Sequence, residues 1–236
     1  MKDKLYELSK LILCLLIFFF IGDISIMLLK IFNFDILNNT KYTVIFQFIL
    51  SLILLIVFTI IYFKTIKNDF KKIKKDAIKN IKYIIKMFLV FMIVKYVVSF
   101  ISALIMVLLG FDANSMTSVN QNLIETYVKT FPILMLFSTA IFAPFYEEIL
   151  FRIGFKKVIK NKYLFVLISG FLFGILHVFP LDDGVSLLLG ISQSISYVTM
   201  GIFLSYIYQK TNNIFMSIGV HFLNNFISII AMISMF

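Results

Sequence analysis

The sequence predicts an all-α fold, a polytopic transmembrane bundle of about seven helices, and both composition and hydrophobic runs support that prediction. Of the 236 residues, 61% are hydrophobic and only 14% are charged, and the mean hydropathy is +1.01. Soluble domains contain about 45–50% apolar and about 25% charged residues. Because lipid cannot satisfy backbone polar groups, and because the apolar runs lack the alternation of barrel strands, each run is predicted to be a helix.

Seven apolar segments are long enough, or nearly so, to cross a bilayer. A helix needs about 20 residues to span about 30 Å of hydrocarbon, and only the fifth segment is marginal. No small-residue cleavage site follows the apolar core of the first segment, so that segment is predicted to be an anchor. The segments are residues 11–32, 43–63, 84–109, 131–152, 163–180, 185–208 and 214–235.

The placement of lysines predicts the topology. Basic residues gather before the first segment, in the 64–83 and 152–162 connections, and at Lys210, and these positions fall in alternate loops. The positive-inside rule therefore places the N-terminus in the cytoplasm. The net charge of +10 follows from this bias and does not indicate nucleic-acid binding. Heavy use of Phe, Ile, Lys and Asn indicates a bacterial source, and hence a multi-pass protein of the bacterial cell membrane.

Residues 64–83 interleave lysines with Ile and Phe and are predicted to form a basic amphipathic helix. Such a helix lies on the anionic inner leaflet, so membrane lipids are an expected partner. A site for a specific partner is the alternative.

Two adjacent carboxylates and an arginine fall inside the fourth apolar segment. Charge in hydrocarbon costs at least about 2.5–3.5 kcal/mol per group, so Glu147, Glu148 and Arg152 need a reason to be there. Glu148 and Arg152 are spaced i, i+4 and can pair on one helix face. Glu147 is rotated about 100° away and is left available as a base. Pro144 is predicted to kink the helix just before the glutamates; a charge cluster at a helix end is the alternative explanation.

The first of the two histidines lies in the fifth apolar segment. His177 shares a helix stripe with Gly170 and Gly174, small residues that let another helix approach closely. Phe173, at i, i+4, is predicted to pack over the histidine ring. Taken alone, this pattern favours a hydrogen-bonded core histidine over a catalytic one.

The second histidine, His221, shares a helix face with Asn225. An imidazole and a carboxamide side by side offer two donors aimed in one direction, which can hold an oxyanion or orient a substrate carbonyl. Hydrogen bonding between helices is the alternative, and for Asn224 it is the preferred interpretation.

Three motifs in this order resemble the signature of the CPBP family. That family comprises the CAAX prenyl proteases of the Ras-converting type and the bacteriocin-processing or immunity (Abi) proteins. The resemblance covers about residues 131–230, each motif lies in a predicted transmembrane segment, and no motif residue is substituted. The motifs are Glu147-Glu148-x-x-x-Arg152, Phe173-x-x-x-His177 and His221-x-x-x-Asn225.

The resemblance implies an intramembrane endopeptidase with a conical cavity that faces the cytoplasm. Its substrate would be a membrane-associated or lipidated peptide or protein, such as a CAAX protein or a bacteriocin precursor. The roles carried over by matching position are water activation for Glu147 and His177, support of the site for Glu148 and Arg152, and oxyanion binding for His221 and Asn225.

Family members are named metalloproteases, and the candidate ligands for a divalent metal such as Zn²⁺ are Glu147, His177 and His221. The His-x-x-Glu-His spacing of one class of zinc protease is absent from the sequence. A metal-free mechanism, in which a carboxylate base and a histidine act on water, is equally allowed.

Two regions are predicted. Residues 1–130 are N-terminal transmembrane helices that include the basic segment, and residues 131–236 are a catalytic four-helix core of the CPBP type. The enzyme hypothesis competes with a non-catalytic one, a proton-coupled transporter or an accessory or immunity factor that uses the same polar residues. The sequence shows no internal repeat, which argues against a transporter. Convergence of the motif residues on one cavity would favour the enzyme.

Overall fold

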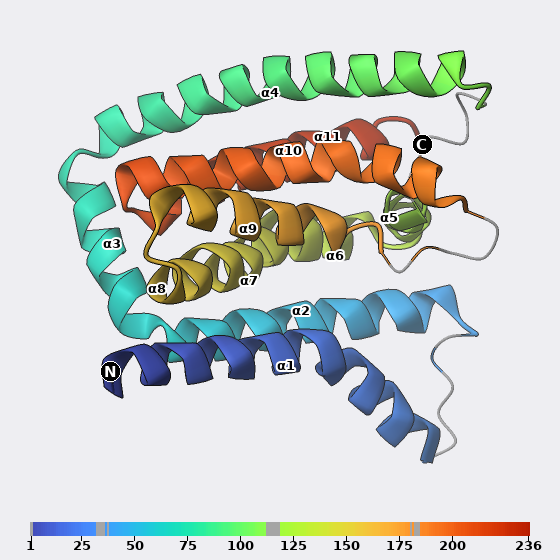
Figure 1. Ribbon diagram of the computed structural model, residues 1–236. Helices are drawn as coiled ribbons and strands as arrows, with labels where there is room; N and C mark the ends of the chain where they lie inside the picture. The colour runs from blue at the N-terminus through green and yellow to red at the C-terminus, as the bar shows by residue number, and fades with distance from the viewer. Residues whose placement is uncertain (1, 32–35, 37, 112–118, 180, 182–184) are drawn as a thin grey trace.

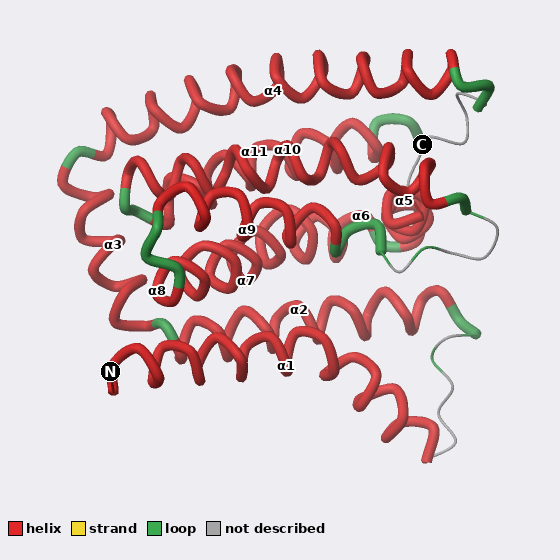
Figure 2. The backbone as a smooth tube through the Cα atoms, viewed as in Figure 1, coloured by secondary structure: helices red, strands yellow, loops and turns green. Residues whose placement is uncertain are grey.

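The computed structural model describes residues 2–31, 36, 38–111, 119–179, 181 and 185–236, and every regular element within them is helical. Figure 1 shows the helices as a bundle, and Figure 2 shows the loops that join them. The predicted all-α bundle is confirmed. Its elements are α1 (Lys2–Ile31), α2 (Thr40–Ile61), α3 (Phe63–Lys75), α4 (Ala77–Leu108), α5 (Val119–Thr130), α6 (Pro132–Met135), η2 (Leu136–Phe142), α7 (Ala143–Glu148), η3 (Ile149–Gly154), α8 (Phe155–Val158), α9 (Lys162–Ile175), α10 (Leu187–Thr211) and α11 (Ile214–Ile233).

Six helical segments in the described part of the chain are long and apolar enough to cross a membrane. They are α1, α2, α4, the continuous helical stretch 132–158, α10 and α11. The fifth predicted span, residues 163–180, is shorter than expected. Its helix α9 has 14 residues and is about 21 Å long, whereas the hydrocarbon layer is about 30 Å thick. Helix α9 therefore does not reach across the layer by itself.

The basic segment 64–83 belongs to two helices, with α3 and α4 separated at Asp76. Helix α3 crosses one end of the bundle, which we call the α3 end (Figure 1). Its Asp69 is buried there and accepts hydrogen bonds from the Ile214 amide at 3.1 Å and, at its own carbonyl, from Asn213 at 3.0 Å. The segment thus fastens the α3 end to the start of α11, and its contact with lipid stays a prediction.

Helix α5 occupies residues that the sequence analysis placed outside the predicted spans. It lies at the opposite end of the bundle, which we call the α5 end (Figure 1). A small buried cluster joins it to α2, α6 and α11, and its members are Val44, Val128, Met135 and Ile229. The lysines of the 64–83 and 152–162 connections lie at the other end, so the α5 end is the lysine-poor one.

Helices α9 and α10 pack with their backbones in contact. A Cβ atom at Gly170 would collide with the backbone of Ile202, and one at Gly174 with the backbone of Val198. In return, Gly201 of α10 lies against the carbonyl of Gly170. The close approach predicted from the small-residue stripe is confirmed.

We expect Gly174→Ala to lower thermal stability and Gly22→Ala to leave it unchanged or slightly raised. A Cβ at Gly174 overlaps the backbone of Val198, and overpacking of this kind costs about 1–3 kcal/mol. At Gly22 the nearest atom is a side-chain carbon of Leu50 at 3.8 Å, an ordinary contact, and alanine is the better helix former. Melting temperatures of the two detergent-purified variants test this, and equal values would contradict the packing.

Candidate active site

The two glutamates lie on α7, between the π-helical segments η2 and η3. The Ala143 amide bonds to the carbonyl of Ser138, five residues back, which widens the helix immediately before Pro144. Proline has no amide donor and disfavours a regular α-helical ladder next to it. Where the sequence predicted a kink, the structure therefore has a widened turn, and Glu147 and Glu148 follow it directly.

Glu148 and Arg152 form a fully buried, bidentate ion pair. Nε of Arg152 donates to Oε2 of Glu148 at 2.9 Å, and Nη2 donates to Oε1 at 3.1 Å. Two parallel bonds of this kind are among the strongest and most directional that side chains form. The guanidinium also lies 5.0 Å from the centre of the Phe173 ring. The pairing predicted from the i, i+4 spacing is confirmed.

Ser169 of α9 completes the environment of the guanidinium. Its hydroxyl accepts from Nη1 of Arg152 at 2.9 Å and donates to the carbonyl of Phe151 at 2.6 Å. Ser205 of α10 donates to the same hydroxyl at 3.1 Å and to the carbonyl of Gly201 at 2.8 Å. The ion pair is thus tied to both neighbouring helices.

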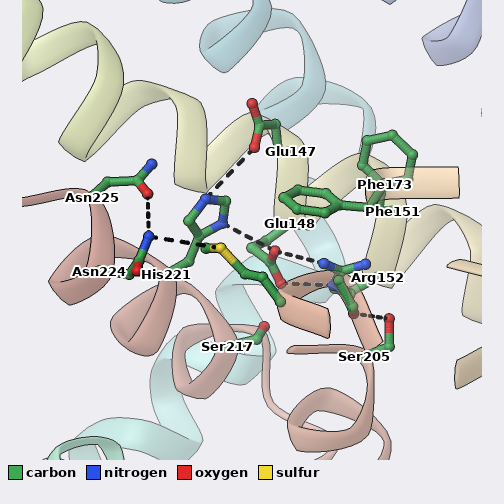
Figure 3. Close-up of polar contacts among 12 residues, drawn as sticks. Glu147, Glu148, Phe151, Arg152, Phe173, Ser205, Ser217, His221, Asn224 and Asn225 are labelled. Atoms are coloured by element: carbon green, nitrogen blue, oxygen red, sulfur yellow. Dashed lines mark hydrogen bonds and ion pairs between the residues drawn. The ribbon is translucent and has the colours of Figure 1, made fainter. Parts of the chain in front are cut away.

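His221 lies between the two glutamates, as Figure 3 shows. Its Nδ1 is 3.2 Å from Oε1 of Glu148, and its Nε2 is 3.7 Å from Oε2 of Glu147. Because the Glu148 carboxylate paired with Arg152 can only accept, His221 donates its Nδ1–H to it. The site therefore contains a row of carboxylate, imidazole and carboxylate, with Nε2 facing Glu147.

His177 is held by a backbone bond and by two aromatic rings. Its Nδ1 donates to the carbonyl of Phe173 at 2.7 Å, so the neutral ring keeps a lone pair on Nε2. The Phe173 ring packs at 4.6 Å between centroids, as predicted, and the Tyr197 ring stacks on the imidazole at 4.9 Å.

Asn225 is oriented by its neighbours. Asn224 donates to Oδ1 of Asn225 at 2.9 Å, and Nδ2 of Asn225 donates to the carbonyl of Thr139 at 2.9 Å. The Nδ2 group of Asn225 carries two hydrogens, and the bond to Thr139 uses one of them. The sequence predicted that His221 and Asn225 aim two donors in one direction, whereas here the Nδ1–H of His221 and one N–H of Asn225 point to protein acceptors.

Glu147, His177, His221 and Asn225 line one cavity with a volume of about 410 Å³. The enzyme hypothesis required this convergence. His177 reaches the cavity from the turn that follows α9. Polar residues of α2, α5, α10 and α11 complete the wall, among them Gln47, Asn120, Gln121, Gln193, Ser196 and Ser228.

The cavity extends from Glu147 toward the α5 end, where Asn120 contributes to its wall. Aromatic rings fill the space on the other side: Phe215 contacts Phe70 of α3 at 5.6 Å and Phe145 of α7 at 6.3 Å. This corrects the expectation of a cavity that faces the lysine-rich end. On that side of the glutamates, these aromatic rings pack beneath α3.

Lys95, Thr139 and Tyr197 are among the residues of the site that were not predicted. Lys95 donates to Oδ1 of Asn224 at 3.1 Å, which confirms the helix-joining role expected for Asn224. A signal for Lys95 was present, since it is a lone charge in an apolar run. Thr139 and Tyr197 gave no signal, because their roles depend on which helices meet.

The candidate metal ligands do not form an assembled set. Within the described ranges, no group of three or more His, Cys, Asp or Glu side chains is arranged to hold a metal ion. Glu148 is occupied by Arg152 and His221, and His221 turns its two nitrogens toward the two glutamates. The Nε2 lone pair of His177 has the geometry of a ligand, since the other nitrogen is bonded to a backbone carbonyl.

Comparison with known proteins places this site within a matched region. Residues 129–227 match the family model described as Type II CAAX prenyl endopeptidase Rce1-like, which confirms the resemblance to the CPBP family. An uncharacterized protein of Mycoplasma capricolum is 29% identical over 157 residues, covering 64% of this chain and 46% of that protein. The chain thus spans about half the length of this relative. No solved structure matches the chain.

We expect Arg152→Ala to lower the free energy of unfolding by about 3–5 kcal/mol, because it leaves the buried Glu148 carboxylate without its cation. Lys129→Ala is the matched control. Lys129 and Glu125 are also spaced i, i+4 at 2.9 Å, but both side chains are about half exposed, and such pairs contribute about 0–1 kcal/mol. Melting of both variants in detergent gives the comparison, and similar losses would mean that the buried pair is not critical.

Proposed function

We propose that this protein is an intramembrane endopeptidase of a bacterial cell membrane, hydrolysing peptide bonds of membrane-associated or lipidated peptides or proteins. One observation carries the proposal. Glu147, His177, His221 and Asn225 come together in one cavity, among apolar helices and within the residues that match the endopeptidase family. A proton-coupled transporter needs ionisable groups along a water path, but not an imidazole between two carboxylates beside a carboxamide.

Glu147 is the proposed general base. Unlike Glu148 it is not bonded to Arg152, and its carboxylate borders the cavity. A water held by Glu147 and by the Nε2 lone pair of His177 would attack the carbonyl carbon of the peptide bond. Its proton would pass to Glu147 as the new C–O bond forms.

His221 is proposed to carry that proton onward. Since Glu148 holds Nδ1–H, the Nε2 atom can accept the proton from Glu147, and the imidazolium formed would lie between two carboxylates. The protonated Nε2 and the remaining N–H of Asn225 would then donate to the oxyanion. When the C–N bond breaks, the leaving amine nitrogen takes the proton from His221.

The substrate is proposed to reach the site from the α5 end, toward which the cavity extends. By the positive-inside rule the lysine-rich α3 end lies in the cytoplasm, so the α5 end lies outside. The scissile bond would then belong to a peptide at the outer side of the membrane.

We expect Glu147→Gln to reduce cleavage by about 10²–10⁴-fold, the usual contribution of a general base, and to leave the fold intact. The change removes a base and keeps the shape of the side chain. Glu125→Gln, an exposed site on α5, is the control. Peptides released from membranes of cells carrying each version are compared by mass spectrometry, and equal release from the native and Glu147→Gln proteins would sink the proposal.

Removal of divalent metals is expected to leave cleavage unchanged, because the described residues present no assembled three-ligand set. The purified protein is treated with a chelator, its metal content is measured by elemental analysis, and its activity is compared with that of untreated protein. Loss of activity that Zn²⁺ or Co²⁺ restores would establish a metal-dependent mechanism instead.

Cysteine labelling is expected to place the cavity wall outside the cell. Cys14 is the chain's single cysteine and is fully buried, so Cys14→Ala gives a cysteine-free background. In that background, Ser228→Cys on the cavity wall should react with a membrane-impermeant maleimide in intact cells. Asn68→Cys, exposed on α3, should react only after the cells are opened. The reverse pattern would place the cavity on the cytoplasmic side.

A further inference from the structure

Lys95 is a charged side chain that the proposed mechanism does not use. It is the only charged residue between Lys86 and Asp112, in the apolar part of α4. Its side chain is half-buried and lines the same cavity as Glu147 and His221. Charge at membrane depth is costly and marks a partner or a function.

Among the described residues, the Lys95 ammonium has a neutral partner and no anionic one. Nζ donates to Oδ1 of Asn224 at 3.1 Å. Over the ranges that the structure describes, no carboxylate lies within 4.0 Å of this nitrogen, and the ion pairs involve other cations. An ammonium carries three donors and a full charge, so an anion supplied by a ligand would complete the site.

Uncharged polar contacts also hold α4 against the bundle. Further along the same face of α4, Ser99 bonds to Ser196 at 2.7 Å, and Ser102 bonds to Ser192 at 2.9 Å. These hydroxyl pairs join α4 to α10 without burying charge. A neutral donor at position 95 would satisfy Asn224 equally well, so the charge itself requires an explanation.

We propose that the Lys95 ammonium binds a carboxylate of the peptide substrate, either its C-terminal carboxylate or an Asp or Glu side chain. This inference rests on the proposed endopeptidase function. An unmodified peptide has no other common anionic group at neutral pH, and an ammonium–carboxylate bond is charge-assisted. Asn224 also donates to Asn225, so the anion site adjoins the proposed oxyanion donor. The scissile bond is therefore expected within a few residues of the carboxylate.

Binding tests the site without requiring turnover. Three pools of synthetic apolar decapeptides of matched sequence are used: free acids, C-terminal amides, and amides that contain one Asp. Each pool is dialysed to equilibrium against the full-length Glu147→Gln protein in detergent, and bound peptides are quantified by mass spectrometry. We expect at least one carboxylate-bearing pool to bind about tenfold or more tighter than the plain amides, as for a charge-assisted hydrogen bond. The better of the two identifies the source of the carboxylate.

Variants of position 95 then assign the preference to its charge. In the same background, Lys95→Met should bind all three pools at the level of the plain amides, and Lys95→Arg should keep most of the preference. Lys86→Met, an exposed lysine of the same helix, is the control and should keep all of it. Equal binding of the three pools by the starting protein, or a preference that survives Lys95→Met, would overturn the proposal. If Lys95→Met does not fold, Lys95→Gln takes its place.

Cleavage of the same pools by the protein with Glu147 intact separates this proposal from the proposed function. Faster cleavage of the preferred pool, mainly through a lower KM, supports both, because a positioning residue acts on binding. Cleavage of all pools at one rate, with no binding preference, would support the endopeptidase activity and contradict the proposed role of Lys95. Preferential binding with no cleavage of any pool would support the carboxylate site and contradict the proposed endopeptidase activity.

Discussion

The fully buried ion pair between Glu148 and Arg152 is the interaction on which the rest of the site depends. One charge at this depth would be prohibitively costly, whereas the bidentate pair is neutral overall. The pair also bonds to its surroundings: Arg152 donates to the Ser169 hydroxyl, and Glu148 accepts from His221. The pair therefore fixes the tautomer of His221 and the register of α9 and α11 relative to α7. Glu147, one residue away, takes no part in this ion pair, and for that reason it is the proposed base.

Close helix packing is what lets such short polar side chains meet. A hydroxyl reaches little beyond its own backbone, so the 3.1 Å bond between Ser169 and Ser205 requires α9 and α10 to be nearly in contact. Gly170 and Gly201 provide that contact. Since lipid supplies no hydrophobic force between helices, small residues and polar contacts must hold the core together. The glycine stripe is in this sense part of the site, although no glycine takes part in the chemistry.

The features that the sequence predicted are those set by spacing along one helix. The pairing of Glu148 with Arg152 and the packing of Phe173 on His177 both follow from i, i+4 geometry. Contacts between helices could not be predicted in this way, because they depend on the rotation and tilt of each helix. The position of His221 between both glutamates belongs to that second kind, and so does the bond from Lys95 to Asn224.

The direction predicted for the cavity was wrong for a related reason. The observed direction has a consequence for the proposed mechanism. Lysine counting predicts which end lies in the cytoplasm, but it does not reveal where apolar side chains pack within the bundle. Phe145 and Phe215 pack together on the α3 side of the glutamates, whereas Gln47 and Gln193 border the cavity beyond Glu147. A hydrolase inside a membrane needs water as well as substrate, and water enters along polar walls more readily than between aromatic rings. The polar wall toward the α5 end therefore serves as the proposed route for both reactants, which would bring a substrate carboxylate past Lys95 before its peptide bond reaches Glu147.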